Sequence, residues 1–356
     1  MNKLDNRVRH PIVEEDLKFL TSHYSIPWQE LSGKSVLITG AAGFLAAYMV
    51  ETLLFLNETR QLNVKVIAVC RNRSRFAQRF SHHLKRSDLI CIEQDVSLPF
   101  QVEQQIDFVV HAASQASPKY YATDPVGTLS ANTLGTANLL ELSRLNQVDG
   151  FLYFSSAEVY GEASSVPTSE TDYGYLDPLA VRSCYAESKR MGESMCVSWH
   201  HQYGVPAKIV RPFHTYGPGM SLDDGRVYAD FVADVVNGRD IVLKSDGLTR
   251  RSFCYLADAT AGFWMVLLCG ANSQAYNIGD PDGDMSIRDL AKLVAGLYPE
   301  RNMSVKYEAR DKVNEYLLSQ VSVTCPSVRL ARSLGWSPVT KIEKGFRRTI
   351  DSYIWC

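Results

Sequence analysis

The chain has 356 residues, of which 46% are hydrophobic and 21% charged, and its formal net charge is −2. This is an ordinary globular composition, and the length suggests roughly two domains or one large α/β unit with an appended lobe. The slight negative charge argues against non-specific nucleic-acid binding, which needs excess lysine and arginine, and the sequence has no apolar run long enough for a transmembrane helix.

Residues 1–20 carry scattered charges and no apolar core, so they do not resemble a secretion signal. Eight cysteines are dispersed singly along the chain, with no CxxC pair. Such a pattern is typical of reduced thiols in the cytosol rather than of disulfides or zinc ligands. We therefore expect a cytoplasmic protein with no histidine cluster and no metal site.

Apolar segments alternate with segments of helical periodicity over the first two thirds of the chain. Residues 1–33 are polar and amphipathic and predict a short helical arm. Buried strands are predicted over residues 34–40, 64–71, 89–96, 106–114, 150–161 and 207–219, and helices over 47–58, over 128–145 and around residue 185. This alternation predicts a parallel, doubly wound sheet covered on both faces, which is a Rossmann-type α/β fold.

The pattern changes near residue 212. Helical segments over 225–238, 286–299 and 328–336 are mixed with short strands over 240–245 and 304–309. They predict a smaller, mixed α/β lobe over the open edge of the sheet. We expect an N-terminal arm (1–33), a dinucleotide-binding Rossmann domain (34–211) and a substrate lobe (212–356) that is partly interleaved with it.

A glycine pattern follows the first predicted strand and opens a helix. Gly40 permits a tight turn, Gly43 lets the backbone approach a pyrophosphate, and the small Ala46 allows the helix to pack closely on the strand. The helix N-terminus adds partial positive charge. In this strand–turn–helix context, the spacing predicts a bound dinucleotide.

The end of the second predicted strand leaves the form of the dinucleotide open. An acid at this place grips the adenosine ribose hydroxyls of NAD, but here the strand ends Cys70-Arg71-Asn72-Arg73. Arg71 suits either a 2′-phosphate, which favours NADP, or stacking on adenine. Asp95, after the third strand, suits either a hydrogen bond to the adenine amino group or a solvated turn. We expect NAD, with NADP as the alternative.

Tyr185 and Lys189 lie four residues apart on a predicted helix, so their side chains share a face. A cation close to a tyrosine lowers the free-energy cost of its phenolate, which is then a strong general base near neutral pH. The strand over 150–161 supplies Ser156 and Glu158, and a serine hydroxyl beside the tyrosine steadies developing charge. Beside a nicotinamide, this trio predicts oxidation of a sugar alcohol.

The glycine loop, the serine at the strand end and the YxxxK motif follow one another in this order along the chain. In this the sequence resembles the extended short-chain dehydrogenases/reductases that modify nucleotide sugars, which form the NAD-dependent epimerase/dehydratase family. The resemblance covers about residues 34–340. Segments 111–136, 169–196 and 211–231 look most like UDP-glucuronate decarboxylases (UDP-xylose synthases), and segment 249–260 is similar to their segment with a functional arginine. It implies a nucleotide-sugar substrate and a cofactor that is reduced and reoxidised within one turnover.

Motifs and resemblance together yield three groups of candidate site residues. The candidate catalytic residues are Ser156, Glu158, Tyr185, Lys189 and Arg251. The candidate cofactor-binding residues are Gly40, Gly43, Phe44, Leu45, Arg71, Asp95, Val96, Ala112, Ala113, Ser114, Lys189 and Pro212. The candidate substrate-binding residues are Ser117, Lys119, Arg182, His214, Arg226 and Arg251.

Each candidate reaction starts by oxidising carbon 4 of the sugar to a ketone. A carboxylate at carbon 6 is then β to the ketone and loses carbon dioxide, with Glu158 and Arg251 available to position and protonate. A 4,6-dehydratase normally uses an Asp-Glu pair, but Ala157 stands at the Asp position, and a 4-epimerase usually has a small or hydroxylic residue in place of Glu158. We expect a UDP-glucuronate decarboxylase-like enzyme, with the dehydratase and epimerase as alternatives.

Departures from the resembled decarboxylases leave the nucleotide open. They usually carry Thr-Ser-Glu where this chain has Ser156-Ala157-Glu158, so one hydroxyl is missing. Their arginine-containing segment near the nucleotide pocket is replaced here by residues 314–327, NEYLLSQVSVTCPS.

Two expectations concern partners and class. Helical segments 135–145 and 185–202 are apolar on one side, and they either pack on the sheet or form the four-helix dimer interface usual in the resembled family. We expect a homodimer. A dinucleotide-sensing regulator is the non-enzymatic alternative, but such proteins typically lose the tyrosine or the lysine, and both are present.

Overall fold

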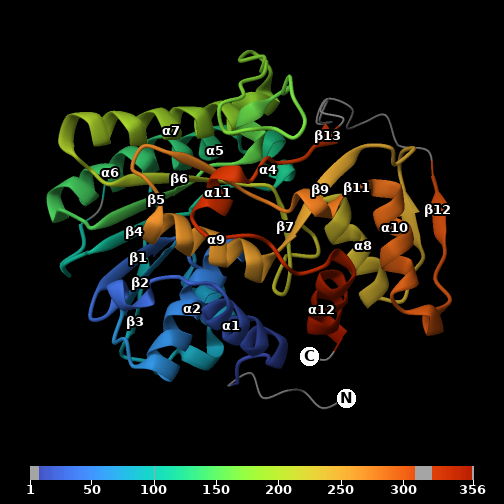
Figure 1. Ribbon diagram of the computed structural model, residues 1–356, viewed down its shortest axis with the longest axis horizontal. Helices are drawn as coiled ribbons and strands as arrows, with labels where there is room; N and C mark the ends of the chain where they lie inside the picture. The colour runs from blue at the N-terminus through green and yellow to red at the C-terminus, as the bar shows by residue number, and fades with distance from the viewer. Residues whose placement is uncertain (1–7, 100, 309–322, 355–356) are drawn as a thin grey trace.

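The computed structural model describes residues 8–99, 101–308 and 323–354. Its centre is a seven-stranded parallel sheet in the order β10-β6-β5-β4-β1-β2-β3 (Figure 1). The strands are β1 (Ser35–Thr39), β2 (Lys65–Cys70), β3 (Leu89–Glu93), β4 (Phe108–His111), β5 (Gly150–Phe154), β6 (Ala207–Pro212) and β10 (Ala275–Ile278). The central strands are buried on both faces, which is why their sequences are continuous apolar runs.

Helices cover both faces of this sheet, as Figure 1 shows. One face carries α1 (Pro11–His23), α2 (Phe44–Arg60) and α9 (Leu256–Cys269). The other carries α5 (Pro125–Asn132), α6 (Leu134–Asn146) and α7 (Cys184–Tyr203), with the short α4 (Pro118–Thr123) beside them. The predicted Rossmann-type α/β fold is confirmed. The single helix predicted over 128–145 is instead two helices that meet at Thr133.

A second lobe stands beside the carboxyl end of the sheet. Its strands are β7 (His214–Tyr216), β8 (Ile241–Leu243), β9 (Arg250–Tyr255), β11 (Asp284–Ser286), β12 (Val305–Tyr307) and β13 (Val323–Thr324). Its helices are α8 (Val227–Val236), α10 (Ile287–Gly296) and α12 (Ile342–Ile354), whereas α11 (Arg329–Ser333) lies beside β10 of the large sheet (Figure 1). Short α3 (Arg73–Arg79) and the 3₁₀ turns η1 (Trp28–Leu31), η2 (Ser81–His83), η3 (Ala157–Tyr160), η4 (Val181–Ser183), η5 (Pro281–Gly283) and η6 (Pro299–Arg301) complete the elements.

The chain passes between the lobes more than once. The strand predicted over 207–219 breaks at Phe213, because β6 pairs within the large sheet whereas β7 pairs with β9 of the second lobe. After β9 the chain returns through α9 to β10, which pairs with β6 at the edge of the large sheet. The domain limits at residues 33 and 211 stay predictions. None of the helices in the described part of the chain is long and apolar enough to cross a membrane.

The arm helix α1 is tied to both lobes through one buried carboxylate. Asp16 accepts hydrogen bonds from the Tyr48 hydroxyl of α2 at 3.0 Å and from the Tyr255 hydroxyl at 2.7 Å. It also pairs with Arg348 of α12 at 2.7 Å. Because these partners come from three separate segments, Asp16 holds the arm, the dinucleotide end of the sheet and the C-terminal helix in one arrangement.

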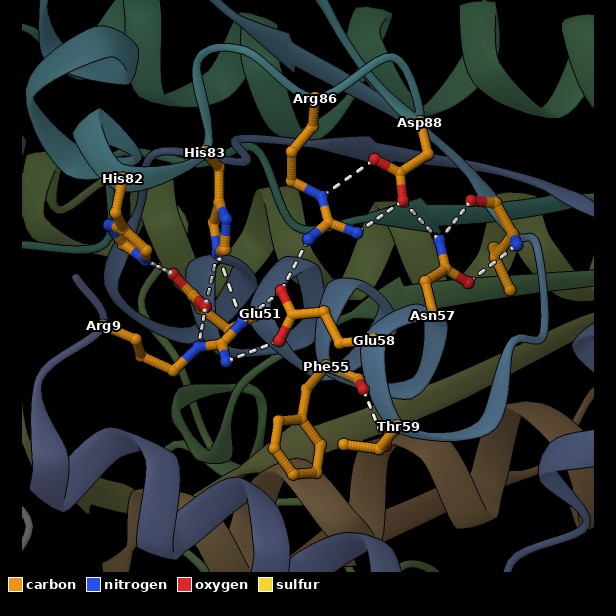
Figure 2. Close-up of polar contacts among 11 residues, drawn as sticks. Arg9, Glu51, Phe55, Asn57, Glu58, Thr59, His82, His83, Arg86 and Asp88 are labelled. Atoms are coloured by element: carbon orange, nitrogen blue, oxygen red, sulfur yellow. Dashed lines mark hydrogen bonds and ion pairs between the residues drawn. The ribbon is translucent and has the colours of Figure 1, made fainter. Parts of the chain in front are cut away.

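A second buried carboxylate gathers two histidines, so the expectation of no histidine cluster is wrong (Figure 2). Glu51 on α2 faces His82 Nε2 at 2.9 Å and His83 Nε2 at 3.0 Å. The Nε of Arg9 donates to the same carboxylate at 2.9 Å, and its other nitrogens contact Glu58. The sequence alone could not reveal this, because the packing of α2 on η2 creates the cluster. Arg9 supplies the positive charge beside Glu51, so the cluster is a salt bridge that joins the segment before α1, α2 and η2.

We predict that Glu51→Gln lowers the free energy of unfolding by about 3 kcal/mol at pH 7, because it removes one partner of a buried ionic cluster. Burial alone would raise the pKa of Glu51, but hydrogen bonds from His82 and His83 bring it below its usual value. The stabilisation is therefore present above the unfolded-state pKa of about 4.3 and fades as pH falls below it.

Urea unfolding of the full chain at pH 7 and pH 3.5 measures this effect. The matched control is Glu14→Gln, which removes an exposed ion pair to Lys18 and should change stability by less than about 0.5 kcal/mol. Equal stability losses for the two variants at pH 7 would contradict the assignment.

Candidate active site

One cavity of about 2930 Å³ lies at the carboxyl ends of the sheet strands, and the second lobe forms its other wall. A crevice at this edge is where open parallel sheets bind their ligands. All the candidate residues line it: Gly40, Gly43, Phe44, Leu45, Arg71, Asp95, Val96, Ala112, Ala113, Ser114, Ser117, Lys119, Ser156, Glu158, Arg182, Tyr185, Lys189, Pro212, His214, Arg226 and Arg251. Residues 314–322 of the departing segment lie outside the described residues.

The glycine loop forms a cradle that only small residues permit. Gly40 has φ +64°, and a Cβ on it would lie 2.8 Å from the Cα of Ala113. A Cβ on Gly43 would lie 2.9 Å from the carbonyl oxygen of Gly40. Nearby, the hydroxyl of Ser114 is buried and has no hydrogen-bond partner among the described residues. The cradle, the N-terminus of α2 and this hydroxyl fit the diphosphate and nicotinamide of a dinucleotide.

Basic side chains border the cavity where the second strand ends. Asn72 caps α3, and Arg71 and Arg75 are exposed on the cavity wall. Arg73 is engaged elsewhere, because its Nη2 donates to the carbonyl of Cys91 at 3.3 Å. Asp95 holds its own turn by accepting bonds from the amide and hydroxyl of Ser97 at 2.9 and 2.7 Å.

The helix α7 carries the tyrosine and lysine on its buried face. Burial follows from the packing of α7 against α5 and against the end of β5, and Tyr185 also stacks on Tyr121 with ring centroids 5.1 Å apart. Lys189 Nζ donates to the carbonyl of Phe154 at 2.6 Å and lies 5.8 Å from the centre of the Tyr185 ring. Ser156 follows β5 and its hydroxyl is a hydrogen-bond partner of Tyr185.

The pKa of Tyr185 differs from the expectation of an easily formed phenolate, because its shift is upward. Burial raises the pKa of Tyr185, and the hydrogen bond from Ser156 and the charge of Arg226 oppose that rise. Burial also lowers the pKa of Lys189 to about 7. The expected role of Arg226 in substrate binding stays a prediction, but Arg226 lies where its charge favours the phenolate. No sequence pattern predicted this, because Arg226 arrives from the second lobe.

A group of charged residues lines the cavity near the trio. Glu158 lies 3.5 Å from Arg182, and it also favours the charged form of Arg251. His214 has its Nδ1 atom buried without a partner among the described residues, and burial with the nearby Arg251 lowers the pKa of His214 to about 3. One carboxylate between two guanidiniums leaves this wall positive, which suits an anionic ligand.

Ser117 and Lys119 connect the two walls of the cavity. The hydroxyl of Ser117 donates to the carbonyl of Asp224 at 2.6 Å, and Lys119 Nζ donates to the carbonyl of Asp223 at 3.2 Å. Both contacts hold the loop that precedes α8 and Arg226. The expectation that these two residues bind substrate stays a prediction.

Comparisons with known proteins agree with this geometry. Residues 36–279 match the model of the NAD dependent epimerase/dehydratase family. UDP-glucuronic acid decarboxylase 6 of Arabidopsis thaliana is 34% identical over 315 residues, 88% of this chain and 87% of that protein. UDP-glucuronic acid decarboxylase 1 of Danio rerio is 31% identical over 350 residues, 97% and 79% of the two chains.

The fold is also that of a solved relative. The UDP-glucuronic acid 4-epimerase of Bacillus cereus, solved with UDP-glucuronic acid and NAD, superposes with a TM-score of 0.75 at 22% identity, covering 90% of this chain and 98% of the other. At that identity the likeness concerns the fold. The family match over most of the chain and the identity to two decarboxylases establish that this chain belongs to the NAD-dependent epimerase/dehydratase family of enzymes.

Proposed function

We propose that the chain converts UDP-glucuronate to UDP-xylose and carbon dioxide. The observation that carries this proposal is the positive wall made by Arg182 and Arg251 around Glu158, in the same cavity as Tyr185. A sugar with a carboxylate at carbon 6 complements such a wall, whereas a neutral hexose does not. The identity to two UDP-glucuronic acid decarboxylases supports the same substrate.

The glycine cradle and Lys189 would hold the dinucleotide, which would supply a reversible hydride acceptor. Tyr185 accepts the proton of the carbon 4 hydroxyl as that carbon loses hydride, and Ser156 holds the reacting oxygen. Lys189 and Arg226 offset the negative charge that forms on the phenol. The product of this half-reaction is a 4-keto sugar acid.

The second half-reaction breaks the bond between carbons 5 and 6. The electron pair of that bond moves into the ketone to form an enolate as carbon dioxide leaves, and carbon 5 then takes a proton. Arg182 and Arg251 orient the carboxylate, and Glu158 is placed to hold the water or proton donor. Return of hydride to carbon 4 and of the proton from Tyr185 completes the UDP-pentose.

The alternative reactions diverge once the ketone has formed. A dehydratase needs an acid beside Glu158, where Ala157 stands. A 4-epimerase acting on UDP-glucuronate would share the positive wall, as the UDP-glucuronic acid bound to the Bacillus cereus enzyme illustrates, but it would retain carbon 6. Decarboxylase and epimerase are therefore distinguished by the mass of the product.

We further infer a homodimer, which the sequence predicted through segments 135–145 (α6) and 185–202 (α7), and we place it on the outer faces of α5 and α7 because apolar side chains are exposed there. Val126 is 69% exposed, Met191 51% and Val197 44%. A cytosolic location is supported by the dispersed cysteines, of which the seven described are free thiols.

The purified chain, supplied with NAD and UDP-glucuronate, should release carbon dioxide and a UDP-pentose detectable by mass spectrometry. Parallel incubations with UDP-, dTDP-, GDP- and CDP-hexoses and hexuronates test the nucleotide and the alternatives. A UDP-hexuronate of unchanged mass would indicate an epimerase, a loss of water a dehydratase, and no turnover of any hexuronate would exclude the proposal.

Tyr185→Phe should lower kcat by about 10²–10⁴-fold, because it removes the proton acceptor. Cofactor binding, followed by quenching of protein fluorescence, should stay within about twofold, since the ring and its stacking on Tyr121 remain. Tyr120→Phe is the matched control, because Tyr120 is partly exposed on the adjacent helix α4. Full activity of Tyr185→Phe would refute the role of Tyr185 as the proton acceptor.

We infer NAD as the cofactor, with an adenosine end that tolerates a 2′-phosphate because Arg71 and Arg75 border it and no acid ends β2. NADP should therefore bind within about tenfold of NAD. Arg71→Ala should weaken NADP binding by about tenfold while changing NAD binding little, since a charge-assisted bond to phosphate contributes about 1.5 kcal/mol.

Isothermal titration with each dinucleotide measures these affinities. Arg73→Ala is the control, because Arg73 is engaged with Cys91 and Glu93. Strong rejection of NADP by the unmodified chain would refute the inference about the adenosine end and leave NAD as the cofactor.

A further inference from the structure

A buried ion pair lies one helical turn beyond Lys189 along α7. Glu193 follows Lys189 by one turn of α7, so the two side chains share the inner face of that helix. The Glu193 carboxylate accepts bonds from Nε and Nη2 of Arg211 on β6, at 2.8 and 2.6 Å. It also accepts a bond from the hydroxyl of Ser155 at 2.5 Å. Ser155 immediately precedes Ser156, so this carboxylate touches the segment that carries the site.

Arg211 is anchored on its far side. Its Nη1 donates to the hydroxyl of Tyr160 and to the carbonyl of Glu170, both at 2.9 Å. Tyr160 in turn donates to Asn277 of β10 at 2.5 Å. The side chain of Arg211 is 5% exposed and that of Glu193 14%. The pair is therefore fixed by a polar network that extends to the edge of the large sheet.

The groups that face Lys189 come from three elements. From β4 comes His111, from β5 the ring of Tyr153 at 5.1 Å, and from α7 Tyr185, Glu193 and Cys196. Within this set His111 is buried and its pKa is lowered to about 3, first by burial and then by Lys189, so it is neutral. Burial raises the pKa values of Tyr153, Tyr185 and Cys196, so these groups are neutral as well. Glu193 is the anion of the set.

We propose that Glu193 is a positioning residue, which holds Lys189 as an ammonium and, through Ser155, fixes the end of β5 that carries Ser156. The same carboxylate thus acts on Lys189 and on the segment that carries Ser156, without touching substrate. The predicted effect on turnover rests on the proposed function, whereas the predicted effect on the protonation of Lys189 does not.

The sign of the effect is set by the charges. Burial lowers the pKa of Lys189, and Glu193 opposes that shift. Replacing Glu193 with Gln removes the opposing charge, so the pKa of Lys189 should fall by about one unit or more. At pH 7.5 less of Lys189 then carries a proton, and the phenolate of Tyr185 loses its neighbouring cation.

The direct test needs no substrate. Full-length protein labelled with ¹³C at lysine Cε is titrated by NMR, and the Lys189 signal is assigned by its absence in Lys189→Met. Glu193→Gln should move the titration midpoint down by about one pH unit or more. Glu187→Gln is the matched control, because Glu187 lies on the same helix and pairs with Arg190 at its surface; it should leave the midpoint unchanged.

Turnover supplies the second readout. The ratio of kcat/KM for Glu193→Gln to that of the unmodified chain should fall by about threefold between pH 6.5 and pH 8, whereas a loss of packing alone would be pH-independent. Ser155→Ala keeps the charge, so it should lower kcat while leaving the Lys189 midpoint in place.

Glu193→Gln leaves Arg211 without its partner and can reduce folding. Glu193→Gln/Arg211→Met removes both charges and should move the Lys189 midpoint in the same direction. An unchanged Lys189 midpoint in the folded variants would overturn the proposal, whatever the chain does with UDP-glucuronate. A shifted midpoint in a chain inactive on every sugar would instead overturn the proposed function and retain the role of Glu193.

Discussion

The site depends on the burial of one ammonium group. Lys189 is 2% exposed, and its Nζ donates to the Phe154 carbonyl at the last residue of β5. A buried charge is tolerated only where hydrogen bonds and an opposite charge offset its desolvation. Lys189 meets this requirement through the Phe154 carbonyl, and Glu193, one turn further along α7, supplies the opposite charge. Tyr185 and Ser156 are then located by the same contact, because one lies a turn before Lys189 and the other two residues after Phe154.

The two lobes contribute different chemistry to the cavity. The large sheet supplies backbone geometry, in the glycine cradle and the strand ends, and a helix with a base and its cation. The second lobe supplies guanidinium groups, from Arg226 before α8 and Arg251 on β9. Hydride transfer between a dinucleotide and a sugar needs both contributions at once. The contacts of Ser117 and Lys119 with the loop before Arg226 connect them across the opening.

Local sequence patterns predicted those features whose geometry is set within a few neighbouring residues. The glycine spacing and the four-residue interval between Tyr185 and Lys189 are set within one turn or one helix, so their placement could be stated in advance. The alternating apolar segments sufficed for the sheet. The position of Arg226 near Tyr185, the pair of Glu193 with Arg211 and the histidines at Glu51 could not be stated. Each joins segments whose proximity depends on how helices pack over the sheet, and the type of a residue does not predict that packing.

The same limit applies to the break at Phe213. Residues 207–219 have the pattern of one apolar strand, yet the chain changes sheets within it, because β6 finds its neighbours in the first lobe and β7 in the second. Only the pairing partners distinguish the two halves. The chain therefore passes from the first lobe to the second at Phe213.

The return of the chain to the large sheet at β10 has an evolutionary consequence. Because β7, α8, β8 and β9 of the second lobe precede β10 whereas the rest of that lobe follows it, neither lobe is a contiguous stretch of gene. A recombination event with one crossover between relatives would join half of one lobe to half of another. Transplanting a new sugar specificity onto this dinucleotide framework requires at least two crossovers, so gradual substitution along the cavity wall is the more accessible route to diversification.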